Sequence, residues 1–119
     1  MNGVRVRFLD RNKIVERLTR LARELIVSRK DVLEVSLFGS LVRGNYAPGS
    51  DADIFILLRG DSRRITERVP EFLDHFSEVG LPVEVFPYTV EEITQMNEVG
   101  FIRTLHKDKI VLGCREVSK

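Results

Sequence analysis

Residues Ser36–Leu58 read SLFGSLVRGNYAPGSDADIFILL and carry the most distinctive chemistry in this chain of 119 residues. One apolar run ends abruptly in Gly39 and Ser40, and a second is entered through Asp51 and Asp53. Because side chains alternate along a strand, the two aspartates should project from one face, with Cα atoms roughly 6.5–7 Å apart. Two carboxylates placed in this way can share divalent cations.

The residues before the aspartates are suited to holding phosphate. Gly39 lets the backbone approach a phosphate closely, and the Ser40 hydroxyl and the following N–H groups face it at a helix start. Arg43 adds positive charge one helical turn later. Asp51 and Asp53 would hold Mg²⁺ against the same phosphates, because Mg²⁺ prefers a few carboxylates together with phosphate oxygens. The stretch therefore predicts a site for nucleotide phosphates.

A third carboxylate would complete a site for two metal ions, and Glu84 is the best candidate. It interrupts the apolar run PVEVF at residues 82–86. Structural alternatives remain for each of these residues. Asp51 and Asp53 could cap the entrance to a strand, Glu84 could face solvent from an edge strand, and Arg43 could form an ion pair with either aspartate.

Length, charge and cysteine content limit the classes of protein. The length predicts one domain, residues 1–119, in which residues 1–11 are either an edge strand or a flexible arm. The formal net charge of +1 gives no strong signal for nucleic acid. Cys114 is the only cysteine, which excludes an internal disulfide. The start of the chain lacks an apolar signal core, and no apolar run reaches membrane-spanning length, so we expect a cytoplasmic protein.

The order of periodic segments predicts an α/β fold with a mixed sheet flanked by helices. The first predicted helix begins at an Asn12 cap and runs to about Arg29. The later helices are predicted to begin at the Gly39-Ser40 turn, at an Asp61 or Ser62 cap, at a Thr89–Glu92 capping box, and near Phe101. Pro70 should kink the third helical segment or begin a new helix, and Gly80 should end that segment. The predicted strands are 32–38, 51–58, 83–86 (limited by Pro87) and 110–112.

The pattern of Gly39-Ser40, ten further residues, Asp51-x-Asp53 and a later isolated acid resembles the nucleotidyltransferases of the DNA polymerase β superfamily. Within that superfamily the chain is most similar to the minimal nucleotidyltransferase (MNT) domains that pair with HEPN proteins in prokaryotic toxin–antitoxin systems. The likeness covers about residues 12–112. Glu84 departs from the many minimal members that have Asp there, although the superfamily accepts either acid.

The resemblance implies an Mg²⁺-dependent enzyme that transfers a nucleoside monophosphate, AMP from ATP, to an acceptor hydroxyl. Asp51 and Asp53 would bind both metal ions, and Glu84 would bind one and help to activate the attacking oxygen. A chain of this length has no room for an acceptor domain, so we expect the acceptor to be a tyrosine of a HEPN-type partner. Association of the chain with a second copy of itself is the other expected form of complex. Two alternatives stay open: an antibiotic-type transferase acting on a small molecule, and a non-catalytic antitoxin that masks its partner.

Overall fold

The fold is described by a computed structural model that covers residues 11–44, 51–96 and 100–116. These residues form five helices and four strands, which confirms the predicted α/β class. None of these helices is long and apolar enough to cross a membrane. The elements in chain order are α1 (Arg11–Ser28), β1 (Val32–Phe38), α2 (Ser40–Arg43), β2 (Ala52–Leu58), α3 (Ile65–His75), β3 (Val83–Thr89), α4 (Val90–Met96), α5 (Gly100–Asp108) and β4 (Ile110–Cys114).

The four strands form one mixed sheet in the order β3-β2-β1-β4. Strand β1 is antiparallel to both of its neighbours, β2 and β4, whereas β2 and β3 run parallel. The register pairs Phe38 with Asp53 across β1 and β2, and Asp53 with Glu84 across β2 and β3. Paired residues share a face of the sheet, so this register places two of the predicted acidic residues side by side.

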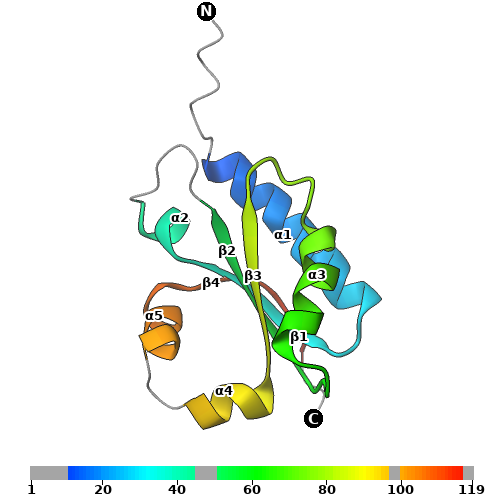
Figure 1. The fold of residues 1–119 in the computed structure, drawn as a ribbon. Coiled ribbons are helices and arrows are strands. Elements are labelled where there is room, and N and C mark those ends of the chain that lie inside the picture. Colours follow the sequence, from blue (N-terminus) through cyan, green and yellow to red (C-terminus); the bar gives the residue numbers. More distant parts are fainter. Residues whose placement is uncertain (1–10, 45–50, 97–99, 117–119) are drawn as a thin grey trace, which may run out of the picture.

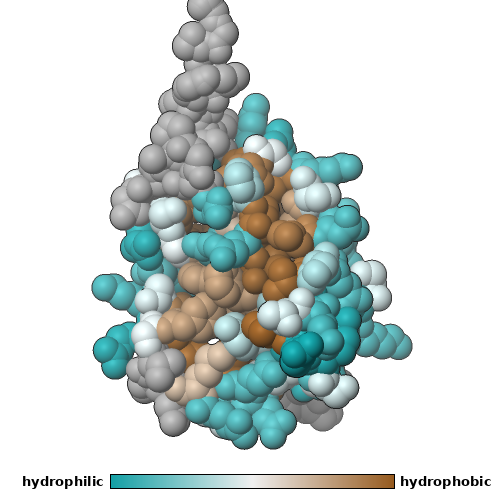
Figure 2. All heavy atoms as spheres, in the orientation of Figure 1, coloured by the Kyte–Doolittle hydropathy of each residue, from teal (hydrophilic) through white to brown (hydrophobic). Residues whose placement is uncertain are grey.

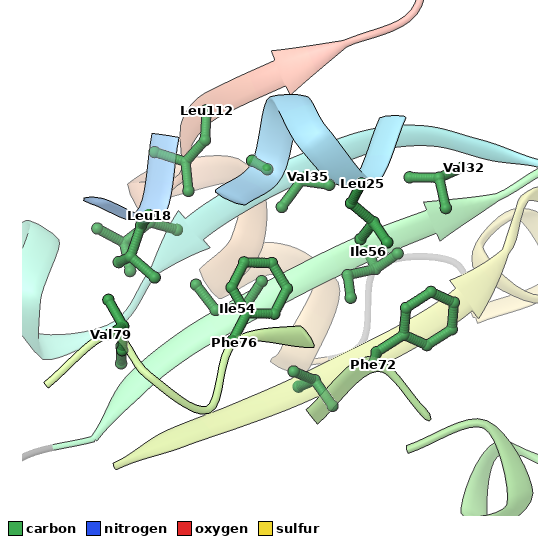
Figure 3. Close-up of a cluster of buried hydrophobic side chains, with 14 of the residues drawn as sticks. Leu18, Leu25, Val32, Val35, Ile54, Ile56, Phe72, Phe76, Val79 and Leu112 are labelled. Atoms are coloured by element: carbon green, nitrogen blue, oxygen red, sulfur yellow. The ribbon is translucent and has the colours of Figure 1, made fainter. Parts of the chain in front are cut away.

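Helices α1 and α3 cover one face of the sheet (Figure 1) and bury the main core there. In α1 the buried residues recur at the helical period and come from one stripe: Ile14, Leu18, Ala22 and Leu25. Figure 3 shows side chains of α1, the sheet and α3 pointing toward one another, among them Leu18, Ile54 and Phe72. Each fully buried side chain of this size stabilises the fold by about 1.5–3 kcal/mol.

Helices α4 and α5 lie against the opposite face (Figure 1), where a smaller cluster contains several aromatic rings. Alternation along β2 divides its side chains between the two faces: Ala52 and Ile54 enter the main core, whereas Phe55 enters the aromatic cluster. Asp53 alternates with Ala52 and Ile54, so it belongs to the face with the aromatic cluster. The fold therefore presents the acidic residues beside α5 and away from the main core.

Strand β3 is longer than predicted, because it continues through Pro87 to Thr89. Proline interrupts a central strand by removing a ladder donor, but it is tolerated in an edge strand. β3 is the last strand of the sheet on its side, and Pro87 pairs in register with Ile56 of β2. The prediction that Pro87 limits the strand is wrong for this reason. At the other edge, β4 likewise runs two residues past its predicted end to Cys114.

Three predicted helix boundaries also differ from the structure. Helix α1 already includes Arg11, so Asn12 is its second residue and not its cap. Helix α3 begins at Ile65, because Asp61 accepts hydrogen bonds from the backbone and side chain of Arg63 and caps nothing. The helix then continues through Pro70 without starting a new one and ends at His75, before Gly80 is reached.

Other local predictions are confirmed. The capping box at the start of α4 is present: the Thr89 N–H donates to Glu92 Oε1 at 2.9 Å, and the Glu92 N–H donates to Thr89 Oγ1 at 3.1 Å. The short helix α2 is closed by Gly44, which has φ 84°. The edge strand or arm predicted for residues 1–11 lies almost entirely outside the described residues, which begin at Arg11.

Candidate active site

The turn after β1 brings the backbone against a carboxylate. Gly39 has φ 86° and ψ −153°, a conformation that is essentially restricted to glycine. A Cβ atom added to Gly39 would lie 2.2 Å from Asp53 Oδ2, closer than any two such atoms can come. Gly39 is thus needed for two separate reasons, the turn itself and the space that the Asp53 carboxylate occupies. Ser40 follows directly as the first residue of α2.

The three predicted acidic residues come from the neighbouring starts of β2 and β3. Asp53 and Glu84 are direct partners in the parallel ladder, and Asp51 precedes β2 by one residue. Asp53 is half-buried, whereas Asp51 and Glu84 are exposed. The sheet register, and not sequence proximity, brings Glu84 to the aspartates. In the sequence, Glu84 lies 30 positions after Ile54, the residue that directly follows Asp53.

The electrostatic environment of Asp53 is unfavourable for its charged form. Burial, together with the negative charges of Glu84 and Asp51, raises the pKa of its carboxyl group to about 6. The charge of Arg43 opposes this shift without cancelling it. A cation placed among the carboxylates would remove the repulsion, because it favours the ionised form of each group.

The chemistry of this donor set fits Mg²⁺, which binds hard oxygen ligands and usually retains water and phosphate oxygens in its shell. In the described part of the chain, no three His, Cys, Asp or Glu side chains are already close enough to enclose an ion. The negative charges of Glu84 and Asp51 both raise the pKa of Asp53, so both carboxylates act electrostatically on it.

Arg43 is held by a residue that the sequence pattern does not reveal. Its Nη1 lies 2.8 Å from Oδ2 of Asp108, at the end of α5, so its ion-pair partner is neither Asp51 nor Asp53. The Asp108 side chain is only 10% exposed, and the Arg43 side chain is 44% exposed. The positive charge of Arg43 still acts on Asp53. A link between residues 65 positions apart has no local signal in the sequence.

An aromatic cluster borders the acidic residues on the same face. Phe101 of α5 lies at its centre, with ring centroids 5.6 Å from Phe38, 5.5 Å from Phe86 and 5.4 Å from Tyr88. Phe38 is the ladder partner of Asp53, so the cluster begins directly beside the candidate site. Figure 2 shows apolar residues reaching the surface over β3, in the middle of the view, with hydrophilic residues around them.

A buried arginine at the other end of β3 is a second residue that the sequence analysis misses. Arg68 is 1% exposed, and its guanidinium donates to both carboxylate oxygens of Glu92 at 2.8 Å and to the Pro87 carbonyl at 2.9 Å. It also donates to the carbonyls of Asp61 and Arg63. These contacts join the loop before α3 to the end of β3 and the start of α4, which is a structural role.

Taken together, a Gly-Ser turn after an antiparallel strand, paired acids on the next two strands and flanking helices define the nucleotidyltransferase class of α/β fold. A family profile described as "Nucleotidyltransferase domain" matches residues 11–112, and the chain belongs to this family. The resemblance predicted from the sequence is confirmed at the level of the family and the fold. A comparison with curated proteins gave no match.

Solved structures share the fold at low sequence identity. A provisionally assigned nucleotidyltransferase from Sulfolobus solfataricus is 22% identical over 88% of this chain and 84% of that chain, with a TM-score of 0.61. A chain of a toxin–antitoxin complex determined with AMP-PNP is 18% identical over 91% of this chain and 76% of that one, with a TM-score of 0.50. A mutant of the MntA–HpeT toxin–antitoxin complex gives the same values.

Proposed function

We propose that the protein is an Mg²⁺-dependent nucleotidyltransferase that transfers AMP from ATP to a tyrosine hydroxyl of a helical HEPN-type partner, and that it acts in this way as an antitoxin. The observation that carries the proposal is the ladder pairing of Asp53 with Glu84, beside the Gly39 turn, within a nucleotidyltransferase-family fold. One similar fold comes from a toxin–antitoxin complex containing AMP-PNP, which supports both the choice of nucleotide and the presence of a partner.

Each site residue has a role in the proposed reaction. Asp51 and Asp53 would hold two Mg²⁺ ions, and Glu84 would hold one of them. Bound Mg²⁺ supplies positive charge to the triphosphate and increases the acidity of an attacking hydroxyl. Glu84 would orient that hydroxyl and accept its proton.

The transfer itself breaks a phosphoanhydride bond of ATP and forms a phosphodiester bond to the acceptor. The acceptor oxygen forms a bond to the α-phosphorus, and the bond from that phosphorus to the bridging oxygen breaks, so that pyrophosphate leaves. Ser40 and Arg43 would donate hydrogen bonds to the departing phosphates, where negative charge develops. Gly39 keeps the backbone close enough for Ser40 to reach them.

The partner is inferred from the architecture and the exposed apolar surface of the described residues. The described residues form a single sheet with its flanking helices and contain no second domain for an acceptor. Apolar residues reach the surface over the edge strand β3 (Figure 2), and Leu73 of α3 and Val90 of α4 are 37% and 42% exposed. We infer that a protein partner covers apolar surface of this kind and supplies the acceptor residue.

Transfer of label tests the proposal directly. The purified protein, ATP labelled at the α-phosphate, Mg²⁺ and the product of the adjacent reading frame are combined, and label on the partner is measured. We expect label with the wild type and a loss of roughly a thousandfold with Asp53→Asn, because losing one metal ligand removes several kcal/mol of transition-state stabilisation. Glu24→Gln, an exposed carboxylate on α1, is the control and should retain transfer.

Other outcomes distinguish the alternatives. Tight binding of the partner without label would indicate an antitoxin that masks its partner. Label on an aminoglycoside or another small hydroxyl compound, without any partner protein, would indicate a small-molecule transferase. Equal transfer by the wild type and by folded Asp53→Asn would remove the acidic cluster from the reaction.

A further inference from the structure

Helix α5 is anchored across the same sheet face as the acidic residues. Near its start, Phe101 packs in the aromatic cluster, and Leu105 one turn later is buried. Just after its end, Lys109 forms an ion pair with Glu34 of β1 at 2.7 Å, and its N–H donates to the Leu105 carbonyl at 3.0 Å. Asp108 lies between these anchors, so its carboxylate is held by packed structure on both sides.

Arg43 has the opposite character. It is the last residue of the four-residue helix α2, and its side chain is 44% exposed. An arginine side chain loses considerable rotamer entropy when it is fixed in one position. The ion pair with Asp108 uses one terminal nitrogen, Nη1, at 2.8 Å. Helix α2 begins directly after Gly39, and Gly39 lies against the Asp53 carboxylate. The pair with Asp108 therefore fixes the Arg43 side chain within one helical turn of the acidic cluster.

We propose that Asp108 is a positioning residue: its buried carboxylate holds the Arg43 guanidinium at the edge of the candidate active site, so that nucleotide phosphates meet a cation that is already oriented. This inference rests on the proposed function, because it assigns Arg43 to the nucleotide. A guanidinium offers five N–H donors in a fixed plane, so one edge can bind Asp108 while another meets a phosphate.

The test measures the affinity of the full chain for a non-hydrolysable ATP analogue with Mg²⁺ by isothermal titration calorimetry. Asp108→Asn should weaken binding roughly three- to tenfold, since binding must then order one rotamer-rich side chain. Arg43→Gln should weaken it at least as much, and the double variant Arg43→Gln, Asp108→Asn should bind no worse than Arg43→Gln alone. Asp108→Glu should restore part of the affinity.

Lys109→Met is the matched control, because it breaks the neighbouring ion pair with Glu34 and leaves the Arg43–Asp108 pair intact. It should reduce thermal stability but leave nucleotide affinity unchanged, which separates positioning from a structural contribution of α5. Unchanged or tighter binding by Asp108→Asn would overturn the proposal, and tighter binding would show that Asp108 withholds Arg43 from the nucleotide. The proposal is also overturned if Asp108→Asn weakens binding as much in the Arg43→Gln background as in the wild type, because Asp108 would then not act through Arg43.

Failure of this inference and failure of the proposed function give different results. If the wild type binds the analogue and Asp53→Asn weakens that binding, the nucleotide site stands whatever Asp108→Asn does. If the wild type does not bind the analogue with Mg²⁺, both the proposed function and the role of Asp108 are wrong.

Discussion

Two clusters of charged side chains lie at opposite ends of the same pair of parallel strands, β2 and β3. At the start of the strands, Asp53 faces Glu84 in the ladder, and burial together with neighbouring negative charge raises the pKa of Asp53 to about 6. At their end, Arg68 binds Glu92, and its hydrogen bonds together with those of Thr89 lower the pKa of Glu92 to about 2. One cluster disfavours its own charge, and the other stabilises it.

Under the proposed function, the difference separates a site that binds a ligand from a cluster that stabilises the fold. A structural cluster satisfies its charges internally, as Arg68 does with carbonyl and carboxylate acceptors. A cluster that must bind a cation retains an excess of negative charge until the cation arrives. The comparison predicts that substitutions at the Arg68 end reduce stability, whereas substitutions at the Asp53 end reduce activity.

Arg68→Leu should have the largest effect on stability. It leaves the Pro87 carbonyl and the loop carbonyls before α3 without their donor and removes the charge partner of Glu92, so we expect a loss of about 3 kcal/mol in the free energy of unfolding. Chemical denaturation measures it. Arg63→Gln is the control: Arg63 is 40% exposed and pairs with Asp61 and Glu71 at the surface, so its loss should reduce stability much less than Arg68→Leu does. Equal effects of the two substitutions would contradict the structural role of Arg68.

Glu84→Gln should reduce transfer roughly a hundredfold, because it removes one metal ligand and a proton acceptor. The two aspartates remain to hold the metal that accompanies the triphosphate, so nucleotide affinity should change much less than turnover. Kinetics with labelled ATP separate the two effects. Undiminished turnover in a folded Glu84→Gln protein would exclude Glu84 from the mechanism.

Gly39→Ala should lower both stability and transfer. Its backbone conformation is costly for any residue with a Cβ, by about 1–3 kcal/mol, and the new atom would displace the Asp53 carboxylate. Gly44→Ala is a matched control, because Gly44 also has positive φ (84°) but an added Cβ meets nothing within 4 Å. Denaturation should show a cost for both variants, and the transfer assay should show a large loss for Gly39→Ala alone.

The pH dependence of stability should reveal the charge of Glu92. Because hydrogen bonds from Arg68 and Thr89 lower the Glu92 pKa from 4.5 to about 2, the stabilisation of the fold by the Glu92 charge is fully present above pH 4.5 and is lost as the pH falls toward 2. Glu92 is 39% exposed, so the effect is screened to about 1 kcal/mol. Glu92→Gln should therefore be less stable than the wild type at pH 7, and the difference should shrink below pH 4.5. A difference that is constant down to pH 2 would show that the charge contributes nothing.

Local patterns in the sequence were sufficient for much of the fold. The apolar period of α1, the Gly39 turn and the Thr89–Glu92 capping box each depend on residues within a few positions of one another. The nucleotidyltransferase resemblance rested on the same kind of local motif. These features could be predicted because their determining contacts are short in sequence.

What could not be predicted depends on the order of strands. Pro87 fits within β3 only because that strand is at an edge of the sheet. Arg68 is buried and hydrogen-bonded to Pro87 and Glu92 because the crossover from β2 through α3 brings it to them. Asp108 meets Arg43 because α5 returns across the sheet face, and no periodicity marks a charge pair formed in that way.

One measurement tests most directly whether the acidic cluster awaits a cation: the thermal midpoints of wild type and Asp53→Asn, each in chelator and with saturating Mg²⁺ and ATP, at pH 8. Without metal, Asp53→Asn should melt higher, because it removes one of three repelling carboxylates. With Mg²⁺ and ATP the order should reverse, since ligand at a hundredfold excess over its Kd stabilises the wild type by about 2.7 kcal/mol and the variant by less. If Asp53→Asn melts lower without metal, or if Mg²⁺ and ATP raise both midpoints equally, the cluster is not a cation site.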